Sequence, residues 1–278
     1  MSEDKTVADL LESWSKQIDG FVEEHAQRIW GFLSVEDELP EPKGNELLFV
    51  SGNWYDRGKA NKLAELARHY SDARIVLAGG FGRLSSQRSE ELGAEALEMR
   101  EFLMNYGISP KRMVLYTGGR QTGDNIDFLL YWKKIIFENK KPRIISVDES
   151  YLVRRVRSTL LGYMSKHNEE SIAVSVVSSG TKSYQDLTAL HNDCSLITLH
   201  LMAVELDRLD TYSTIGSQPY LFSSSIAYGG VESFGGKKTI LESARIIRDA
   251  HNFEQGRQIM NERKLALELF APNYTNYP

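Results

Sequence analysis

Four short segments of the chain combine glycine with hydroxyl, amide, carboxylate or guanidinium side chains. They are Ser51-Gly52-Asn53, Gly79-Gly80-Phe81-Gly82, Thr117-Gly118-Gly119-Arg120 and Asp148-Glu149-Ser150. Each follows a short apolar run, which is typical of a strand buried on both faces of a parallel sheet. In open α/β sheets, ligands bind outside the carboxyl ends of the strands. The four segments therefore predict one small-molecule site at that edge of a sheet.

Glycine amides and arginine side chains in or near these segments could hold an anion. Gly79, Gly80 and Gly82 would allow backbone amides to approach a phosphate or a carboxylate closely. Arg154 and Arg155 open the predicted helix after the fourth segment, where at least one could bind an anion through two parallel hydrogen bonds. A solvated helix face or a structural ion pair explains the two arginines equally well. We therefore expect a small anionic ligand.

Three carboxylates stand where they could take part in a reaction. Glu95 borders the apolar stripe of its predicted helix, so we expect a general base or, preferably, a structural partner for a cation such as Arg155. Asp148 and Glu149 are adjacent acids at a strand end and could bind ribose hydroxyls, or a magnesium ion together with a phosphate substrate. These three are the candidate catalytic residues. The histidines and the single cysteine show no metal-site spacing, so we predict no dedicated metal site.

Three polar residues begin another predicted helix, after the third segment. Thr122 or Asp124 could cap this helix without any ligand. Asn125 lies beyond the usual cap position, so we expect its side chain to face the site or to tie loops together. With Ser51, Gly52 and Asn53, these residues complete the predicted ligand-binding set.

Alternating strands and helices must position these segments. The apolar runs predict strands at 47–50, 74–78, 113–116, 144–147 and 172–177, and three- and four-residue spacing predicts helices at 57–70, 86–106, 124–137 and 151–164. Their short connections predict an α/β fold with a Rossmann-like, doubly wound and mostly parallel sheet.

The flanking regions are helical in pattern. We expect an N-terminal helical segment over residues 1–40, with helix at 6–33, and the Rossmann-like core over 45–182. A mainly helical C-terminal part, 183–278, with helices at 186–210 and 238–266, would pack on that core.

The net charge, the apolar runs and the cysteine count limit which partners and which cellular location we expect. The net charge of −5 across 278 residues argues against a nucleic-acid binder. No apolar run reaches the roughly 18 residues of a membrane span, and the first residues do not resemble a secretory signal. Cys194 is the only cysteine, so no disulfide can form within the chain. We expect a cytoplasmic protein without a membrane or nucleic-acid partner; the sequence allows a homo-oligomer.

The order of motifs between Val50 and Arg155 resembles the ElyC/SanA/YdcF family, and within it the soluble YdcF type. The matching motifs are Ser51-Gly52-Asn53, Ala78-Gly79-Gly80, Glu95-Ala96 with Met99, Leu103 and Gly107-Ile108, Thr122-Gly123-Asp124-Asn125 and Asp148-Glu149-Ser150-Tyr151-Leu152-Val153-Arg154-Arg155. The chain departs from the family where Asp124 replaces the usual Glu and Leu152 replaces a His. Tyr116 or Thr117 also stands where many members carry a Glu.

The resemblance implies a Rossmann-like domain with a smaller helical addition that binds a nucleotide or an S-adenosylmethionine-like ligand. It implies a site rather than a reaction, so three hypotheses stay open. The protein is a ligand-binding protein of the YdcF type, with or without enzymatic activity. Alternatively, it is a hydrolase or transferase acting on a phosphorylated metabolite. The third hypothesis is a non-catalytic sensor or interaction protein.

Overall fold

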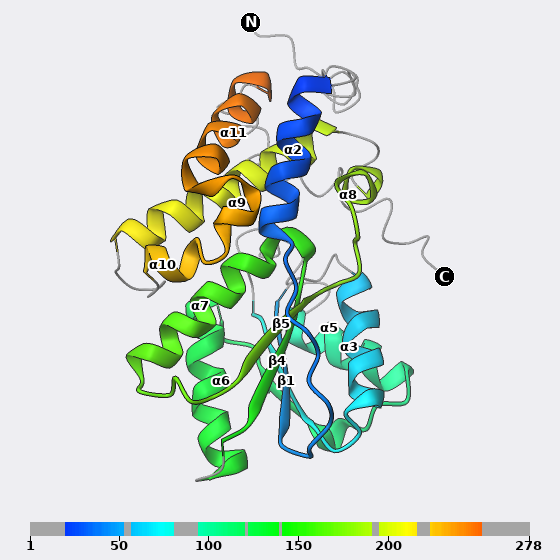
Figure 1. Cartoon of the computed structure of the whole chain (residues 1–278). Coiled ribbons are helices and arrows are strands. Elements are labelled where there is room, and N and C mark those ends of the chain that lie inside the picture. The colour runs from blue at the N-terminus through cyan, green and yellow to red at the C-terminus, as the bar shows by residue number, and fades with distance from the viewer. Residues whose placement is uncertain are drawn as a thin grey trace, which may run out of the picture. The chain divides into compact units, whose positions relative to one another are not determined.

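The computed structural model describes residues 20–52, 57–80, 94–119, 122–138, 141–190, 195–215 and 223–251 (Figure 1). The chain divides into two compact units. One comprises Ser34–Gly180 and Leu209–Gly229. The other comprises Met1–Leu33, Thr181–Arg208 and Gly230–Pro278.

The first of these, here called the sheet unit, contains a five-stranded parallel sheet in the order β3-β2-β1-β4-β5. The strands are β1 (Glu46–Ser51), β2 (Arg74–Ala78), β3 (Met113–Tyr116), β4 (Arg143–Asp148) and β5 (Val174–Ser178). All four strand pairs are parallel. The predicted Rossmann-like α/β class is therefore confirmed. The predicted runs at 74–78 and 113–116 coincide with β2 and β3.

Helices cover both faces of this sheet (Figure 1). Helices α3 (Arg57–His69) and α5 (Glu95–Asn105) pack on one face, in a core that includes Leu48 and Val50. Helices α6 (Thr122–Phe137) and α7 (Val153–Lys166) pack on the other face, in a core that includes Leu47 and Phe49. Successive side chains of a strand point to opposite faces, so a run of consecutive apolar residues supplies both cores.

The predicted helices differ from the observed ones mainly at their ends. The helix predicted at 151–164 begins with a short 3₁₀ turn, η3 (Ser150–Leu152), before α7. Another 3₁₀ turn, η2 (Pro110–Arg112), precedes β3. Of the helix predicted at 86–106, residues 86–93 lie outside the described part of the chain. The short α10 (Ser224–Ala227) and the last residues of α9 (Ser195–Ile215) also belong to the sheet unit.

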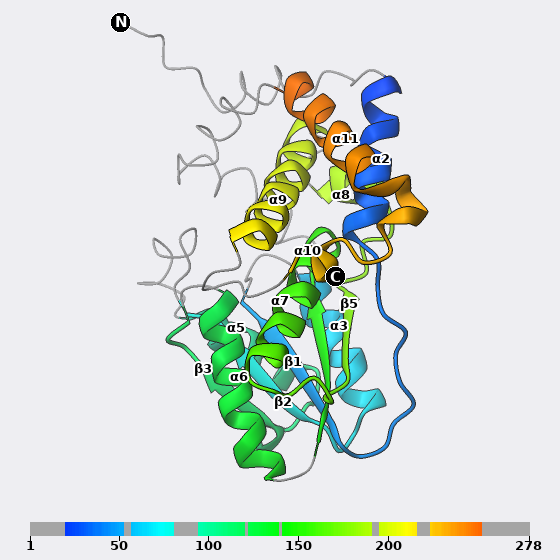
Figure 2. The ribbon, with the colours of Figure 1, turned by 60° about the vertical axis from the view of Figure 1, so that its left-hand side comes forward.

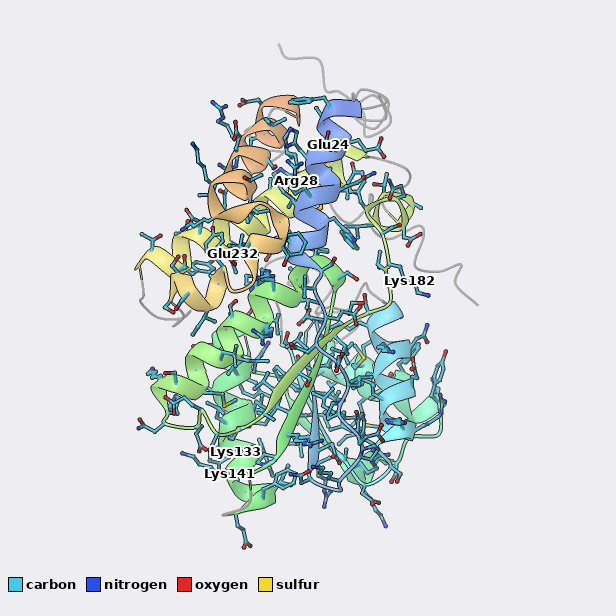
Figure 3. The ribbon with its side chains drawn as sticks, in the orientation of Figure 1. Glu24, Arg28, Lys133, Lys141, Lys182 and Glu232 are labelled. Carbon is cyan, nitrogen blue, oxygen red and sulfur yellow. The ribbon has the colours of Figure 1, made fainter. Side chains whose placement is uncertain are left out.

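The second unit, here called the helical unit, contains α2 (Gly20–Leu33), α8 (Tyr184–Leu190), most of α9, η4 (Val231–Phe234) and α11 (Gly236–His251). Helices α2 and α11 pack together, and His25 Nδ1 lies 2.9 Å from Ser243 Oγ. Along α2, Arg28 Nη2 lies 2.9 Å from Glu24 Oε1 (Figure 3). Of the helix predicted at 186–210, the described residues lie in α8 and α9, and residues 191–194 lie outside the described part of the chain.

No helix in the described ranges is long and apolar enough to cross a membrane. The three-segment division predicted from the sequence, and the packing of the C-terminal part on the core, stay predictions.

Candidate functional site

The loops after β1, β2 and β3 approach one another closely at the carboxyl edge of the sheet. A Cβ atom added to Gly79 would lie 2.7 Å from the Cα of Gly52, a distance that real Cβ atoms essentially never show. A Cβ on Gly80 would lie 2.7 Å from the carbonyl oxygen of Gly119. Glycine is therefore required at positions 79 and 80 because neighbouring backbone occupies the space of a side chain.

The carboxylate of Glu95 lies over two of these glycines. Glu95 is the first residue of α5, and its side chain is half-buried. A Cβ on Gly52 would collide with Glu95 Oε2, and one on Gly79 would lie 2.9 Å from the same oxygen. A carboxyl group thus stands at the ends of β1 and β2, within the predicted site.

The amides of Gly79 and Gly80 are engaged within the protein. Gly79 N donates to the carbonyl of Tyr116 at 2.9 Å, and Gly80 N donates to the carbonyl of Gly119 at 3.0 Å. These two amides are therefore not available to a phosphate, contrary to the role expected from the sequence. They join the ends of β2 and β3 instead.

Asn125 and Arg155 add an acceptor and a cation near the end of β3. Asn125 is buried in the first turn of α6; its Oδ1 lies against Gly119 and has no hydrogen-bond partner among the described residues. Arg155, buried near the start of α7, donates from Nη1 to Thr122 Oγ1 at 3.1 Å. Asn125, Thr122 and Arg155 all belong to the predicted ligand-binding set, and Thr122 and Arg155 are in contact in the structure.

Asp148 is bound to a residue that the sequence analysis missed. Lys59 Nζ donates to Asp148 Oδ1 at 2.9 Å and to the carbonyl of Ser51 at 2.6 Å, and the Lys59 side chain is fully buried. Ser51 Oγ donates to the other Asp148 oxygen at 3.2 Å. The burial of Lys59 had a signal in the sequence, because Lys59 lies four residues before Leu63 on the inner stripe of α3, but that spacing does not identify Asp148 as its partner.

Arg154 serves a different region from its neighbour Arg155. Its Nη1 donates to the carbonyl of Gly229 at 2.9 Å and to that of Ala227 at 3.3 Å, at the end of α10. Burial, together with the nearby Arg157 cation, lowers the pKa of the Arg154 guanidinium to about 10. In this arrangement Arg154 binds backbone carbonyls of its own chain.

The other predicted site residues are placed as follows. Glu149 is buried beside Asp148, whose Oδ1 accepts from the Glu149 amide at 3.1 Å. Asp124 is half-buried in the first turn of α6. Asn53 and Gly82 lie outside the described residues. Within the described ranges, no three His, Cys, Asp or Glu side chains are grouped as metal ligands would be.

Comparison of the sequence with models of known protein families gave no match, and a search of curated proteins also gave none.

Proposed function

We propose that the protein is a YdcF-like small-molecule-binding protein whose ligand is a nucleotide or an S-adenosylmethionine-like molecule. The ligand would bind at the carboxyl ends of β1, β2 and β3. The observation that carries this proposal is the Glu95 carboxylate, whose Oε2 lies against both Gly52 and Gly79. This position in an open parallel sheet is where ligands of such folds bind.

The polar groups at this edge of the sheet favour one class of ligand over another. Glu95 and Asn125 place a carboxylate and an amide oxygen at this edge, and both groups accept hydrogen bonds. The amides of Gly79 and Gly80 donate within the protein. Such acceptors suit ribose hydroxyls or an ammonium group. Arg155 is the nearby cation suited to a carboxylate or phosphate. An adenosine-containing ligand whose amino acid part carries both an ammonium and a carboxylate group therefore fits these groups better than free phosphate does.

The hydrolase or transferase hypothesis has less support from the arrangement of the acids. Asp148 is held by Lys59 and Ser51, so it is not positioned to take a proton from a substrate. That hypothesis would need Glu95 or Glu149 as the base. A non-catalytic sensor would bind its ligand at the same site without turnover. The sensor hypothesis and the hydrolase or transferase hypothesis therefore differ in whether a reaction occurs, and not in the residues that bind the ligand.

A thermal-shift panel tests the proposal. The full chain is mixed separately with S-adenosylmethionine, adenosine, ATP, a sugar phosphate, and magnesium chloride. Saturation at a hundred times the dissociation constant stabilises a protein by about 2.7 kcal/mol, which raises the melting temperature by a few degrees. We expect such a rise with S-adenosylmethionine or a nucleotide. An unchanged melting temperature across the whole panel would overturn the proposal.

A matched pair of variants locates the binding. Glu95→Gln removes the charge over Gly52 and Gly79, whereas Glu101→Gln makes the same change at an exposed position of the same helix. We expect Glu95→Gln to abolish the thermal shift and Glu101→Gln to retain it. Equal shifts in both variants would place the ligand elsewhere. Turnover of a phosphate ester that is lost in Glu95→Gln would favour the hydrolase hypothesis instead.

A further inference from the structure

Helix α6 presents an apolar stripe to solvent in addition to the one that it packs on the sheet. Its inward stripe consists of the buried residues Ile126, Leu129, Leu130 and Lys133. Phe128 is half-buried and packs partly against the core, while Tyr131 is 60% exposed and Ile135 is 49% exposed on the outward side. These three residues are three and four positions apart, which is the spacing of the contact positions of a coiled coil.

The stripe continues onto the edge strand of the sheet. The ring of Phe128 stacks on the ring of Tyr116, the last residue of β3, with centroids 4.3 Å apart. Figure 2 shows α6 beside the β3 end of the sheet. At the opposite edge of the sheet, Asp37 covers part of β5. Its backbone N donates to the carbonyl of Val176, and its Oδ2 accepts from the Val176 amide. The apolar stripe therefore lies at the sheet edge where β3 is the last strand.

Two exposed charges beside the stripe are complementary to each other. Asp127 and Lys134 are both exposed, and their separation of seven residues gives them the same heptad position on one side of the stripe. Asp127 also has His167 Nε2 at 3.9 Å. When two copies of such a helix pack antiparallel, equivalent heptad positions on one side of the stripe face each other. Asp127 of each copy would then face Lys134 of the other.

We propose that this surface, formed by Phe128, Tyr131 and Ile135 with Asp127 and Lys134, is a homodimer interface built from two antiparallel α6 helices. A two-fold axis near Tyr131 would bring the Tyr131 rings of the two copies together. It would also form two identical Asp127–Lys134 pairs, as an isologous contact requires. Because α6 has 16 residues and so extends about 24 Å, the interface lies at the small end of known interfaces. We therefore expect a dimer that dissociates on dilution into the micromolar range.

Sedimentation velocity of the full chain from low to high micromolar concentration is the first test. The wild type should pass from monomer to dimer as the concentration rises. Tyr131→Glu puts two like charges near the proposed axis and should remain monomeric at every concentration. Met104→Glu is the control, because it makes the same kind of change at an apolar residue, 44% exposed, on α5. Circular dichroism should show that both variants are folded.

Charge reversal provides the sharper test. Asp127→Lys alone should abolish the dimer, since each pair becomes Lys against Lys, and Lys134→Asp alone should do the same with two Asp pairs. Mixing these two variants restores opposite charges at both positions, so a one-to-one heterodimer should form. A wild type that is monomeric throughout, a dimer that survives Tyr131→Glu, or a mixture of the two variants that stays monomeric would each overturn the proposal.

Discussion

Lys59 Nζ and Asp148 Oδ1 lie 2.9 Å apart, and the two side chains are 0% and 1% exposed. This ion pair joins α3 to the end of β4, and the second hydrogen bond of Lys59, to the carbonyl of Ser51, includes the end of β1. Ser51 Oγ donates a hydrogen bond to the second oxygen of the Asp148 carboxylate. The pair therefore fixes the two strand ends from which the predicted ligand loops start.

Removing one member of this pair should destabilise the protein strongly. Lys59→Met leaves the Asp148 carboxylate buried without its cation, and we expect the free energy of unfolding to fall by about 3–5 kcal/mol. Asp148→Leu should have a similar cost. The double variant should lose much less than the sum of the two, because it buries no uncompensated charge. Urea unfolding of all four proteins measures the coupling.

An exposed ion pair on the same helix serves as the control. Lys62 Nζ lies 3.1 Å from Glu65 Oε1, with side chains 24% and 65% exposed. Lys62→Met should change the free energy of unfolding by less than about 1 kcal/mol. If Lys59→Met cost no more than Lys62→Met, the buried pair would not hold the strand ends together.

The sequence sufficed for the fold because the strand signal is local. Consecutive apolar residues such as Leu47-Leu48-Phe49-Val50 indicate a strand buried on both faces, and their alternation with helices leaves few arrangements. The partners of the charged residues were not predictable in the same way. Lys59 and Asp148 are separated by 89 positions, and no local pattern marks their contact.

The two adjacent arginines also show that the partners of charged residues cannot be predicted from a local pattern. Successive residues of an α-helix point about 100° apart, so Arg154 and Arg155 had to face different surroundings. The sequence could not tell which of them faces the strand ends. The structure pairs Arg155 with Thr122 and Arg154 with the carbonyls of Ala227 and Gly229.

Substitution of the two arginines should separate stability from binding. Arg154→Met leaves the carbonyl of Gly229 without its donor, so we expect a loss of about 2 kcal/mol in the free energy of unfolding and unchanged ligand affinity. Arg155→Met should weaken binding of an anionic ligand at least tenfold. Calorimetric titration together with urea unfolding measures both effects. Equal loss of affinity in the two variants would contradict this separation.

The glycines at the strand ends should respond differently to an added methyl group. In Gly79→Ala the new Cβ meets the Cα of Gly52, and backbone cannot move aside easily, so we expect a loss of about 2 kcal/mol in stability. In Gly52→Ala it meets mainly the end of the flexible Glu95 side chain. That variant should retain more stability but bind ligand weakly, because the carboxylate is displaced.

Gly20→Ala is the control for these substitutions, because a Cβ there has no atom of the described residues within 4 Å. Its free energy of unfolding should stay within about 0.5 kcal/mol of the wild type. If Gly52→Ala left ligand affinity intact, the ligand would not depend on the position of the Glu95 carboxylate.

Alkaline pH should destabilise the protein through Tyr228. Burial raises the pKa of the Tyr228 phenol, and the hydrogen bond that it donates to Asp210 Oδ1, 2.9 Å away, raises it further. Above a pH of about 10 the unfolded chain loses this proton while the folded protein retains it. The unfolded state then binds fewer protons, so the free energy of unfolding falls as the pH rises, by up to about 1.4 kcal/mol per pH unit.

Comparison with Tyr228→Phe isolates this contribution. Arg154, whose pKa is lowered to about 10, acts in the opposite direction because the folded state loses its proton first, but it is present in both proteins. At neutral pH the variant should be less stable by about 1–3 kcal/mol, since it lacks the hydrogen bond to a charged acceptor. Urea unfolding between about pH 8 and about pH 11 should show that difference shrinking above about pH 10. A difference that stayed constant across this range would mean that the Tyr228 proton is not held more tightly in the folded protein.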